Sequence, residues 1–323
     1  MVPDEQDFAD LDRRLPYHDA ISSKSSPRYV RAFQRLAYFI DVPDRFSLVH
    51  YHASHFLRGT RHHLFEGPYL RWGNIPQIVS FSGSDARIIS QARANNPYFH
   101  LAEDPARDNR TRKYLASISR NIRAVATDVE MVEYVAPYFD QVFIFRQPID
   151  LSRIKAVAYN PDRPPVLLHV PTDPVVKGTE YIERAVEQLE AEGLVFEFRM
   201  RRRLTQAEFH RELADCDIYV DELRVGAYGV SSVEAMAIGK PAVTYVRPDL
   251  VEKYPAELPI VNANPDTITD TLRGLIQDRD RRAHLSQKSR AFVEAYHDAK
   301  LVATELLLAY RQIGLALDGS LGP

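Results

Sequence analysis

The residues from 221 to 243 combine types and spacing that suit the binding of a phosphate. Their sequence is DELRVGAYGVSSVEAMAIGKPAV, in which Gly226 and Gly229 precede a short apolar helix. The first amides of a helix have no backbone acceptors, and the helix dipole makes that end favourable for an anion. We therefore expect the amides of Val230 and Ser231 to contact a phosphate group.

Glu234 adds a second chemical feature to the same helix. It stands three residues after Ser231, on nearly the same side and one turn further along. A carboxylate at that point can accept hydrogen bonds from both hydroxyls of a ribose. Phosphate and ribose together suggest a nucleotide, while the alternative is a packing loop beside a solvated glutamate, since such loops are common in α/β folds.

The sequence gives less support to a metal site or a hydrolase than to a nucleotide site. His50 and His52 share one face of a predicted strand, and three more histidines follow at His55, His62 and His63. No cysteine or acid stands at ligand spacing, so we predict no metal, and positions at the end of a strand, in the core or on the surface are the alternatives for these histidines. The run GVSSV around Ser231 lacks the closing glycine of G-x-S-x-G, and neither G-x-G-x-x-G nor G-x-x-x-x-G-K-[ST] occurs.

Strands that alternate with helices are expected to position these residues. In the first half, strands are predicted at FSLVHYH (from 46), QIVSFS (from 77), RAVAT and QVFIF (from 141), with helices near 28–40, 55–72, 107–120 and 128–138. In the second half, strands are predicted at VLLHV (from 166), LVFEFRM, DIYVDEL, PAVTYV and PIVNA, with helices near 179–192, 206–214, 230–238, 265–278 and 280–315. Connections of this length imply largely parallel sheets with helices on their faces.

The proline-rich stretch 146–165 is the best candidate for a domain boundary. We therefore expect an N-terminal domain over 1–148, whose first 27 residues form a polar arm, and a C-terminal domain over 149–323. Open α/β sheets bind ligands beyond the carboxyl ends of their strands. Two such sheets in tandem predict a site in the cleft between the domains.

Composition narrows the function classes. The 323 residues carry 41 lysines and arginines against 44 acidic residues, a formal net charge of −3, which argues against generic nucleic-acid binding. The single cysteine, Cys216, cannot close an intrachain disulfide, which favours a cytoplasmic location. The acidic start has no apolar core of a signal peptide, and no window suits a transmembrane helix, although contact with a membrane surface stays open.

The run ADCDIYVDELRVGAYGVSSVEAMAIGKPAV resembles the donor-site signature of retaining GT-B glycosyltransferases, glycosyltransferase group 1 or family 4. Tyr228-Gly229 and the EAMAIGKP run from Glu234 match that pattern. The acidic residue that the family carries eight positions before the glutamate is replaced by Gly226. Asp221 or Glu222 could supply that carboxylate from nearby.

HVPTDPVVKGTEYI from His169 is similar to the family's loop that holds the donor diphosphate. The Lys177-Gly178 pair matches, but Thr172 stands where the family has an arginine. The cluster Arg199, Arg201, Arg202 and Arg203 follows a predicted strand. One of these guanidinium groups, Arg201 in the first place, could replace the missing arginine, and a solvated charged face is the alternative.

The N-terminal half resembles the family more weakly. FSGSDAR from Phe81 is similar to a loop that faces the acceptor side, with Ser82 in place of a frequent histidine and with Asp85 and Arg87 retained. His52 joins this acceptor side as a strand-end histidine. QPID from Gln147 resembles the interdomain linker. The family's opening strands are not matched, so we expect a reduced or truncated N-terminal domain and a last helix that returns to it.

The resemblance implies two tandem Rossmann-like domains and sugar transfer from a nucleotide diphosphate to an acceptor hydroxyl, with retention of configuration and no cofactor or metal. It implies catalytic roles for Lys177, Glu234 and Asp85. Gly226, Thr172, Ser82 and the missing strands favour an alternative, a weak or inactive relative that binds nucleotide sugar or serves as a partner subunit. Another GT-B enzyme, such as a nucleotide-sugar epimerase, is a third hypothesis.

Overall fold

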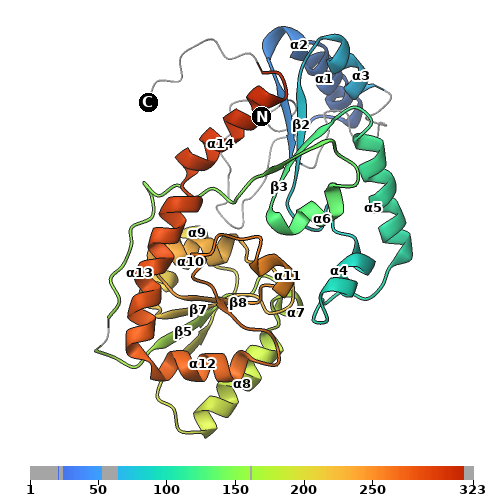
Figure 1. Cartoon of the computed structure of the whole chain (residues 1–323). Coiled ribbons are helices and arrows are strands. Elements are labelled where there is room, and N and C mark those ends of the chain that lie inside the picture. The colour runs from blue at the N-terminus through green and yellow to red at the C-terminus, as the bar shows by residue number, and fades with distance from the viewer. Residues whose placement is uncertain (1–20, 22–24, 53–64, 161, 316–323) are drawn as a thin grey trace. The chain divides into compact units, whose positions relative to one another are not determined.

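The computed structural model describes residues 21, 25–52, 65–160 and 162–315 of the chain. Within these ranges the chain forms two compact α/β units (Figure 1). Unit 1 takes in the described residues up to Ile88, residues 104–145 and the chain from Thr304. Unit 2 takes in residues 89–103 and 146–303. The α/β fold class predicted from the sequence is confirmed.

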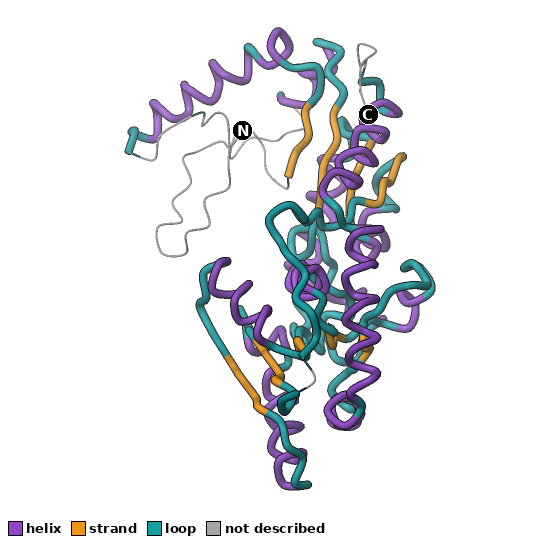
Figure 2. Tube along the Cα trace, turned by 90° about the vertical axis from the view of Figure 1, so that its left-hand side faces the viewer, coloured by secondary structure: helices purple, strands orange, loops and turns teal. Residues whose placement is uncertain are grey.

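The sheet of unit 1 has four parallel strands in the order β1-β2-β3-β4. Figure 2 shows these strands side by side. The strands are β1 (Val49–His52), β2 (Gln77–Phe81), β3 (Ala124–Thr127) and β4 (Gln141–Ile144). The helices are α1 (Arg28–Ile40), α2 (Val42–Arg45), α3 (Glu66–Trp72), α5 (Pro105–Ile118), the 3-10 turn η1 (Val129–Met131) and α6 (Val132–Val135).

Sequential strand order places the connecting helices of unit 1 on one face, because right-handed crossovers all turn the same way. On that face the ring of Phe81 meets Tyr114 of α5 edge-on, 6.2 Å between centroids. The opposite face carries Ile78, Ala124 and Ala126. The second half of α14 (Ala299–Gln312) covers it, with Leu306 and Tyr310 packed against those residues.

The sheet of unit 2 has five parallel strands in the order β6-β5-β7-β8-β9. The strands are β5 (Val166–His169), β6 (Glu197–Met200), β7 (Ile218–Val220), β8 (Ala242–Thr244) and β9 (Val261–Asn262). The helices are α4 (Ile89–Asn95), α7 (Pro174–Lys177), α8 (Thr179–Ala191), α9 (Gln206–Asp215), α10 (Val230–Ile238), α11 (Pro248–Val251), α12 (Ile268–Gln277) and α13 (Arg279–Tyr296).

Helices cover the two faces of the unit 2 sheet. Helices α8 and α12 lie side by side, and their apolar residues form one core with β5, β7, β8 and β9 (Figure 1). Helix α10 packs against β8, α9 and α13. This arrangement buries both faces, as parallel sheets require, and leaves the loops at the carboxyl ends of the strands as the part that can carry a site.

Two predicted elements differ from the structure. The helix predicted over 280–315 is two helices, because Ile149 pairs with the backbone between them: its amide donates to the carbonyl of His297 at 2.7 Å, and its carbonyl accepts from Ala299. The helix predicted over 128–138 is the short η1 and α6, whose first turn is capped by Asp128. Of the helix predicted over 55–72 the structure describes Glu66–Trp72, and residues 53–64 lie outside the described ranges.

Candidate functional site

The candidate site lies where β7 ends and α10 begins, in unit 2. Residues 221–229 connect the two elements. Gly229 is the N-cap residue of α10, with extended backbone and no side-chain cap. Val230 is half-exposed, and neither its amide nor those of Ser231 and Ser232 donates to a backbone acceptor within the described chain. The first amides of α10 therefore have no backbone acceptor among the described residues, and their contact with a phosphate stays a prediction.

Two hydroxyl groups of the same turn point back to Asp221. Ser232 donates to its carboxylate at 2.6 Å, and Ser231 is 3.3 Å from both carboxylate oxygens. Asp221 is almost fully buried. A buried carboxylate is stable only when it is paired and hydrogen-bonded, so these hydroxyls hold the end of β7 and the start of α10 together.

Lys177 supplies the charge that Asp221 needs. Its Nζ lies 2.5 Å from Asp221 and 3.2 Å from Glu222, and all three residues are buried. Burial alone would lower the pKa of the Lys177 ammonium, but the two carboxylates raise that pKa above its ordinary value. Burial opposes ionisation of Asp221 as well, yet Lys177 and the Ser232 hydroxyl keep its pKa below the usual range.

The predicted diphosphate lysine is thus held inside a three-residue ionic cluster, defined here as Lys177, Asp221 and Glu222. An ammonium has three N–H donors, and the two carboxylates use two of them. Gly178 forms the turn after Lys177, and the lysine carbonyl accepts from the amide of Leu223 at 3.1 Å. The matched Lys-Gly pair therefore packs directly against the loop 221–229.

Glu234 lies on α10 at the side that faces α9. Its Oε1 is 3.0 Å from Nε2 of His210 and 3.2 Å from Nε2 of Gln206. The side chain is 12% exposed, so it remains accessible in part. These two α9 partners are residues that sequence reasoning missed, since nothing local relates position 210 to position 234.

The surroundings of Gly226 explain why position 226 is a glycine rather than the acidic residue that the resemblance predicts. Its φ is +92°, and a Cβ built there would lie 2.4 Å from Cγ of Arg247. Arg247 is buried and holds Asp249 through two hydrogen bonds of 3.0 Å. A carboxylate-bearing side chain at 226 would need both a strained backbone and displacement of Arg247.

A turn after α4 ties down the same loop. Asn96 is buried and donates from Nδ2 to the carbonyls of Arg224 and Val225, at 2.8 and 2.9 Å. The carbonyl of Tyr98 accepts from Nε of Arg224, and its ring meets Tyr245 edge-on. The sequence gives no sign that residues 96–98 contact a loop more than 120 positions away.

Other predicted donor residues have partners of their own. Arg201 follows β6 at the carboxyl edge of the sheet, but its guanidinium pairs with Glu212 of α9 at 3.1 Å. Tyr228 is buried, with its hydroxyl 3.2 Å from Nε2 of His297, so its side chain points into the unit 2 core. Only its backbone is left for a bound ligand.

The predicted acceptor residues belong to unit 1. Asp85 accepts from the amides of Ser82 and Gly83, with 2.9 Å to Gly83, and thereby closes the turn after β2. Arg87 forms a two-pronged ion pair with Glu130 at 2.7 and 2.8 Å. These contacts give both residues a structural role, and their role toward an acceptor stays a prediction.

His52 ends β1 and is exposed, with its ring stacked on His50 at 4.3 Å. His50 lies between the hydroxyls of Ser80 and Tyr310, each 2.6 Å away. Burial and the neighbouring His52 lower the pKa of His50 to about 3. The other histidines of the cluster, at 55, 62 and 63, lie outside the described residues.

The chemistry that this arrangement allows follows from its parts. Amides without backbone acceptors and a helix dipole at α10 favour a phosphate, Lys177 uses two of its three N–H donors within the described chain, and Glu234 can accept hydrogen bonds one turn further on. In the part of the chain that the structure describes, no helix has the length and hydrophobicity to cross a bilayer.

A family model matches the part of the chain that contains this site. Residues 153–292 match the family described as "Glycosyl transferases group 1". This range includes Lys177, the loop 221–229 and the whole of α10. No curated protein sequence matches the chain.

Solved structures resemble the fold over most of the chain. The HepE protein of Anabaena, solved in complex with UDP and glucose, is 11% identical, with a TM-score of 0.62 over 91% of this chain and 85% of HepE. Sucrose-phosphate synthase from Thermosynechococcus elongatus is 14% identical, with a TM-score of 0.65 over 97% and 87%. A glycosyltransferase from Rickettsia africae is 13% identical, with a TM-score of 0.59 over 92% and 84%. Residues 153–292 thus match the glycosyl transferases group 1 family, and the chain has the fold of GT-B glycosyltransferases.

Proposed function

We propose that this protein transfers a sugar from a nucleotide diphosphate sugar to an acceptor hydroxyl, with retention of the anomeric configuration and without a metal ion. The observation that carries the proposal is the open start of α10 beside the ionic cluster Lys177, Asp221 and Glu222. The HepE structures contain UDP with glucose, and UDP-glucose, which supports a donor of this class.

Each residue has a proposed part in the reaction. The amides of Val230 and Ser231 receive the diphosphate, whose negative charge grows as the sugar leaves. The free N–H of Lys177 donates to a phosphate oxygen, because Asp221 and Glu222 hold its ammonium in place. Glu234 accepts from the ribose hydroxyls. Such groups are fixed before the reaction begins, so they stabilise the leaving group without reorganisation.

Arg201 is proposed as the second cation of the diphosphate site. It stands at the carboxyl edge of the sheet, and its pair with Glu212 is partly exposed, at 43% and 25% for the two side chains, so the pair contributes little to stability. Asp85 and Arg87 are proposed to shape the acceptor side of unit 1, with His52 and Ser82. No side chain is proposed as the base that deprotonates the acceptor.

Turnover is the direct test. The full chain is incubated with UDP-, GDP- and dTDP-sugars and a panel of hydroxyl acceptors, and released nucleoside diphosphate is followed with and without EDTA. Release with one donor that EDTA does not reduce, and a product with the donor's anomeric configuration by NMR, supports the proposal. Tight nucleotide-sugar binding with no release under any acceptor contradicts it.

Glu234 gives a sharper test of the donor half. In Glu234→Ala we expect nucleotide binding to weaken by roughly 1 to 3 kcal/mol, because the ribose hydroxyls lose their acceptor. Calorimetric titration with UDP and GDP measures the change. Glu187→Ala, an exposed glutamate on α8, is the matched control. Equal affinity in the parent and in Glu234→Ala would remove the ribose role.

A further inference from the structure

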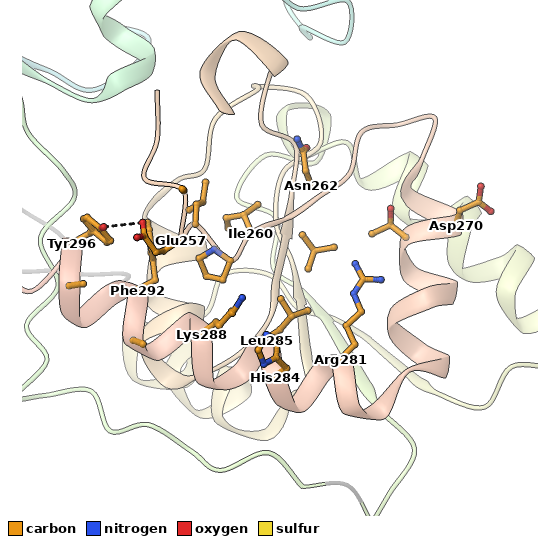
Figure 3. A pocket seen from close by; sticks show the side chains of 17 residues that line it. Glu257, Ile260, Asn262, Asp270, Arg281, His284, Leu285, Lys288, Phe292 and Tyr296 are labelled. Carbon is orange, nitrogen blue, oxygen red and sulfur yellow. Dashed lines mark hydrogen bonds between the residues drawn. The ribbon is translucent and has the colours of Figure 1, made fainter. Parts of the chain in front are cut away.

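A groove runs along α13 at the β9 edge of the unit 2 sheet. Its volume is about 1030 Å³, and its walls are the segment 256–262, the start of α12 and one face of α13 (Figure 3). The face extends from Arg281 to Tyr296, about 22 Å at the helical rise. Neither the loop 221–229 nor α10 contributes to it, so the groove is separate from the donor site.

Two cations of α13 point into the groove. Arg281 and Lys288 stand two turns apart on one face, with His284 between them (Figure 3). Among the described residues, neither Arg281 nor Lys288 has an ion-pair partner. Other arginines of the same helix differ: Arg282 donates to Tyr159 and Arg290 to Glu294, at 2.9 and 2.6 Å.

The acids that line the groove are already engaged. Glu257, at the far end, accepts from the hydroxyl of Tyr296 at 3.1 Å. Asp270 pairs with Arg273 of its own helix and points away from the groove (Figure 3). Glu257 keeps its charge at the far end of the groove, whereas Arg281 and Lys288 are lining cations without an ion pair among the described residues, so an anion placed between them would complement both.

Beside His284, apolar side chains line the groove between these two cations. Leu285 separates the two cations on α13, Ile260 faces them from the opposite wall, and Phe292 continues the surface toward Tyr296. Burial of aliphatic groups on such a surface contributes favourably to binding, whereas a small inorganic anion would leave it in contact with water.

We propose that this groove binds a small amphiphilic anion, with a carboxylate or phosphate between Arg281 and Lys288 and an aliphatic body along Leu285, Ile260 and Phe292. The two cations fix the head group by charge-assisted hydrogen bonds. The apolar walls favour a ligand with an aliphatic body over a head group alone. The two head groups share this chemistry, and the experiment separates them.

Calorimetric titration of the full chain tests the proposal. The probes are decanoate and decyl phosphate below micelle formation, with decanol as the uncharged analogue and acetate and phosphate as head groups alone. We expect one or both anions to bind at least about tenfold more tightly than decanol. Decanol binding as tightly as both anions, or no binding of either anion, overturns the proposal.

Variants locate the binding. In Arg281→Gln/Lys288→Gln we expect the preferred anion to lose at least about tenfold in affinity. The control Lys155→Gln/Arg279→Gln removes the same charge from exposed positions outside the groove and should bind as the parent does. Ala291→Phe, at an exposed helical position, narrows the groove and should weaken binding without a change in charge. Unchanged affinity in the double groove variant contradicts the assignment.

Discussion

Single residues of the donor loop are fixed by contacts that a sequence motif does not express. Gly226 stands where the family resemblance predicts an acidic residue, and the side chain of Arg247 lies beside it. Arg247 occupies the space that any Cβ at 226 would enter. Packing against Arg247 therefore accounts for the glycine at this position and leaves no room for a carboxylate there.

The packing at Gly226 can be separated from its backbone conformation. Gly193 also has a positive φ, +79°, but a Cβ there would meet nothing within 4 Å. Gly193→Ala should cost about 1 kcal/mol from backbone strain alone. Gly226→Ala should cost roughly 1 to 3 kcal/mol more, since Arg247 must move. Urea unfolding of both variants measures the difference, and equal losses would show that Arg247 adapts freely.

The ionic cluster predicts a large effect from one substitution. In Lys177→Met the carboxylates of Asp221 and Glu222 stay buried without their cation, and we expect a loss of about 3 to 5 kcal/mol in the free energy of unfolding. Lys113→Met, at an exposed position of α5, should cost little. A loss below about 1 kcal/mol in Lys177→Met would mean that the cluster is not coupled to folding.

At the scale of elements, the site depends on which loops meet at the carboxyl edge of the unit 2 sheet. Residues 89–103 join these loops, although they lie between two strands of the unit 1 sheet in sequence. Asn96 donates to two carbonyls of the loop. Tyr98 contacts the loops after β8 and β9: its ring packs against Tyr245, and its hydroxyl lies 2.5 Å from the carboxylate of Asp266. The turn after α4 thus acts as a brace for the donor loop.

Removal of the brace should loosen the donor loop. In Asn96→Ala two partly buried carbonyls lose their donor, and we expect a loss of roughly 1 to 3 kcal/mol in stability. Amide hydrogen exchange in residues 221–229 should accelerate with it. Tyr98→Phe keeps the ring against Tyr245 and should leave that exchange rate near the parent value. Unchanged exchange in Asn96→Ala would show that the loop is held from within unit 2's own strands.

At the scale of the whole molecule, buried neutral histidines link stability to pH. Burial lowers the pKa of His169 and of His297 to about 4 each. Both rings hold distant parts of unit 2 together: His169 lies between Val220 and Thr179, and His297 contacts Gln147 and Tyr228. On each ring Nδ1 faces a backbone carbonyl and Nε2 faces a hydroxyl, so protonation of Nε2 would force that hydroxyl to change from donor to acceptor and would leave a buried charge.

The sign of the pH effect follows from the lowered pKa values. In the unfolded chain these histidines take up protons near pH 6.5. In the folded chain they do so near pH 4, because burial lowers both pKa values to about 4. Stability should therefore fall as the pH drops through this window, by up to about 1.4 kcal/mol per pH unit for each histidine. Urea midpoints between pH 7 and 4 measure it. His169→Gln/His297→Gln should flatten the dependence, and the exposed His284→Gln should not.

The sequence by itself determined the α/β class, most strand and helix positions and the motif around α10, because these follow from local hydrophobic periodicity and from glycine and capping residues that act within a few positions. Only the tertiary structure decided that Lys177 lies against Asp221, that His210 lies against Glu234, and that Asn96 closes the loop. It also decided the break between α13 and α14, which depends on Ile149. These outcomes rest on pairings between residues far apart in sequence, and a side chain carries no local signal of the distant partner that will satisfy its charge or hydrogen bond.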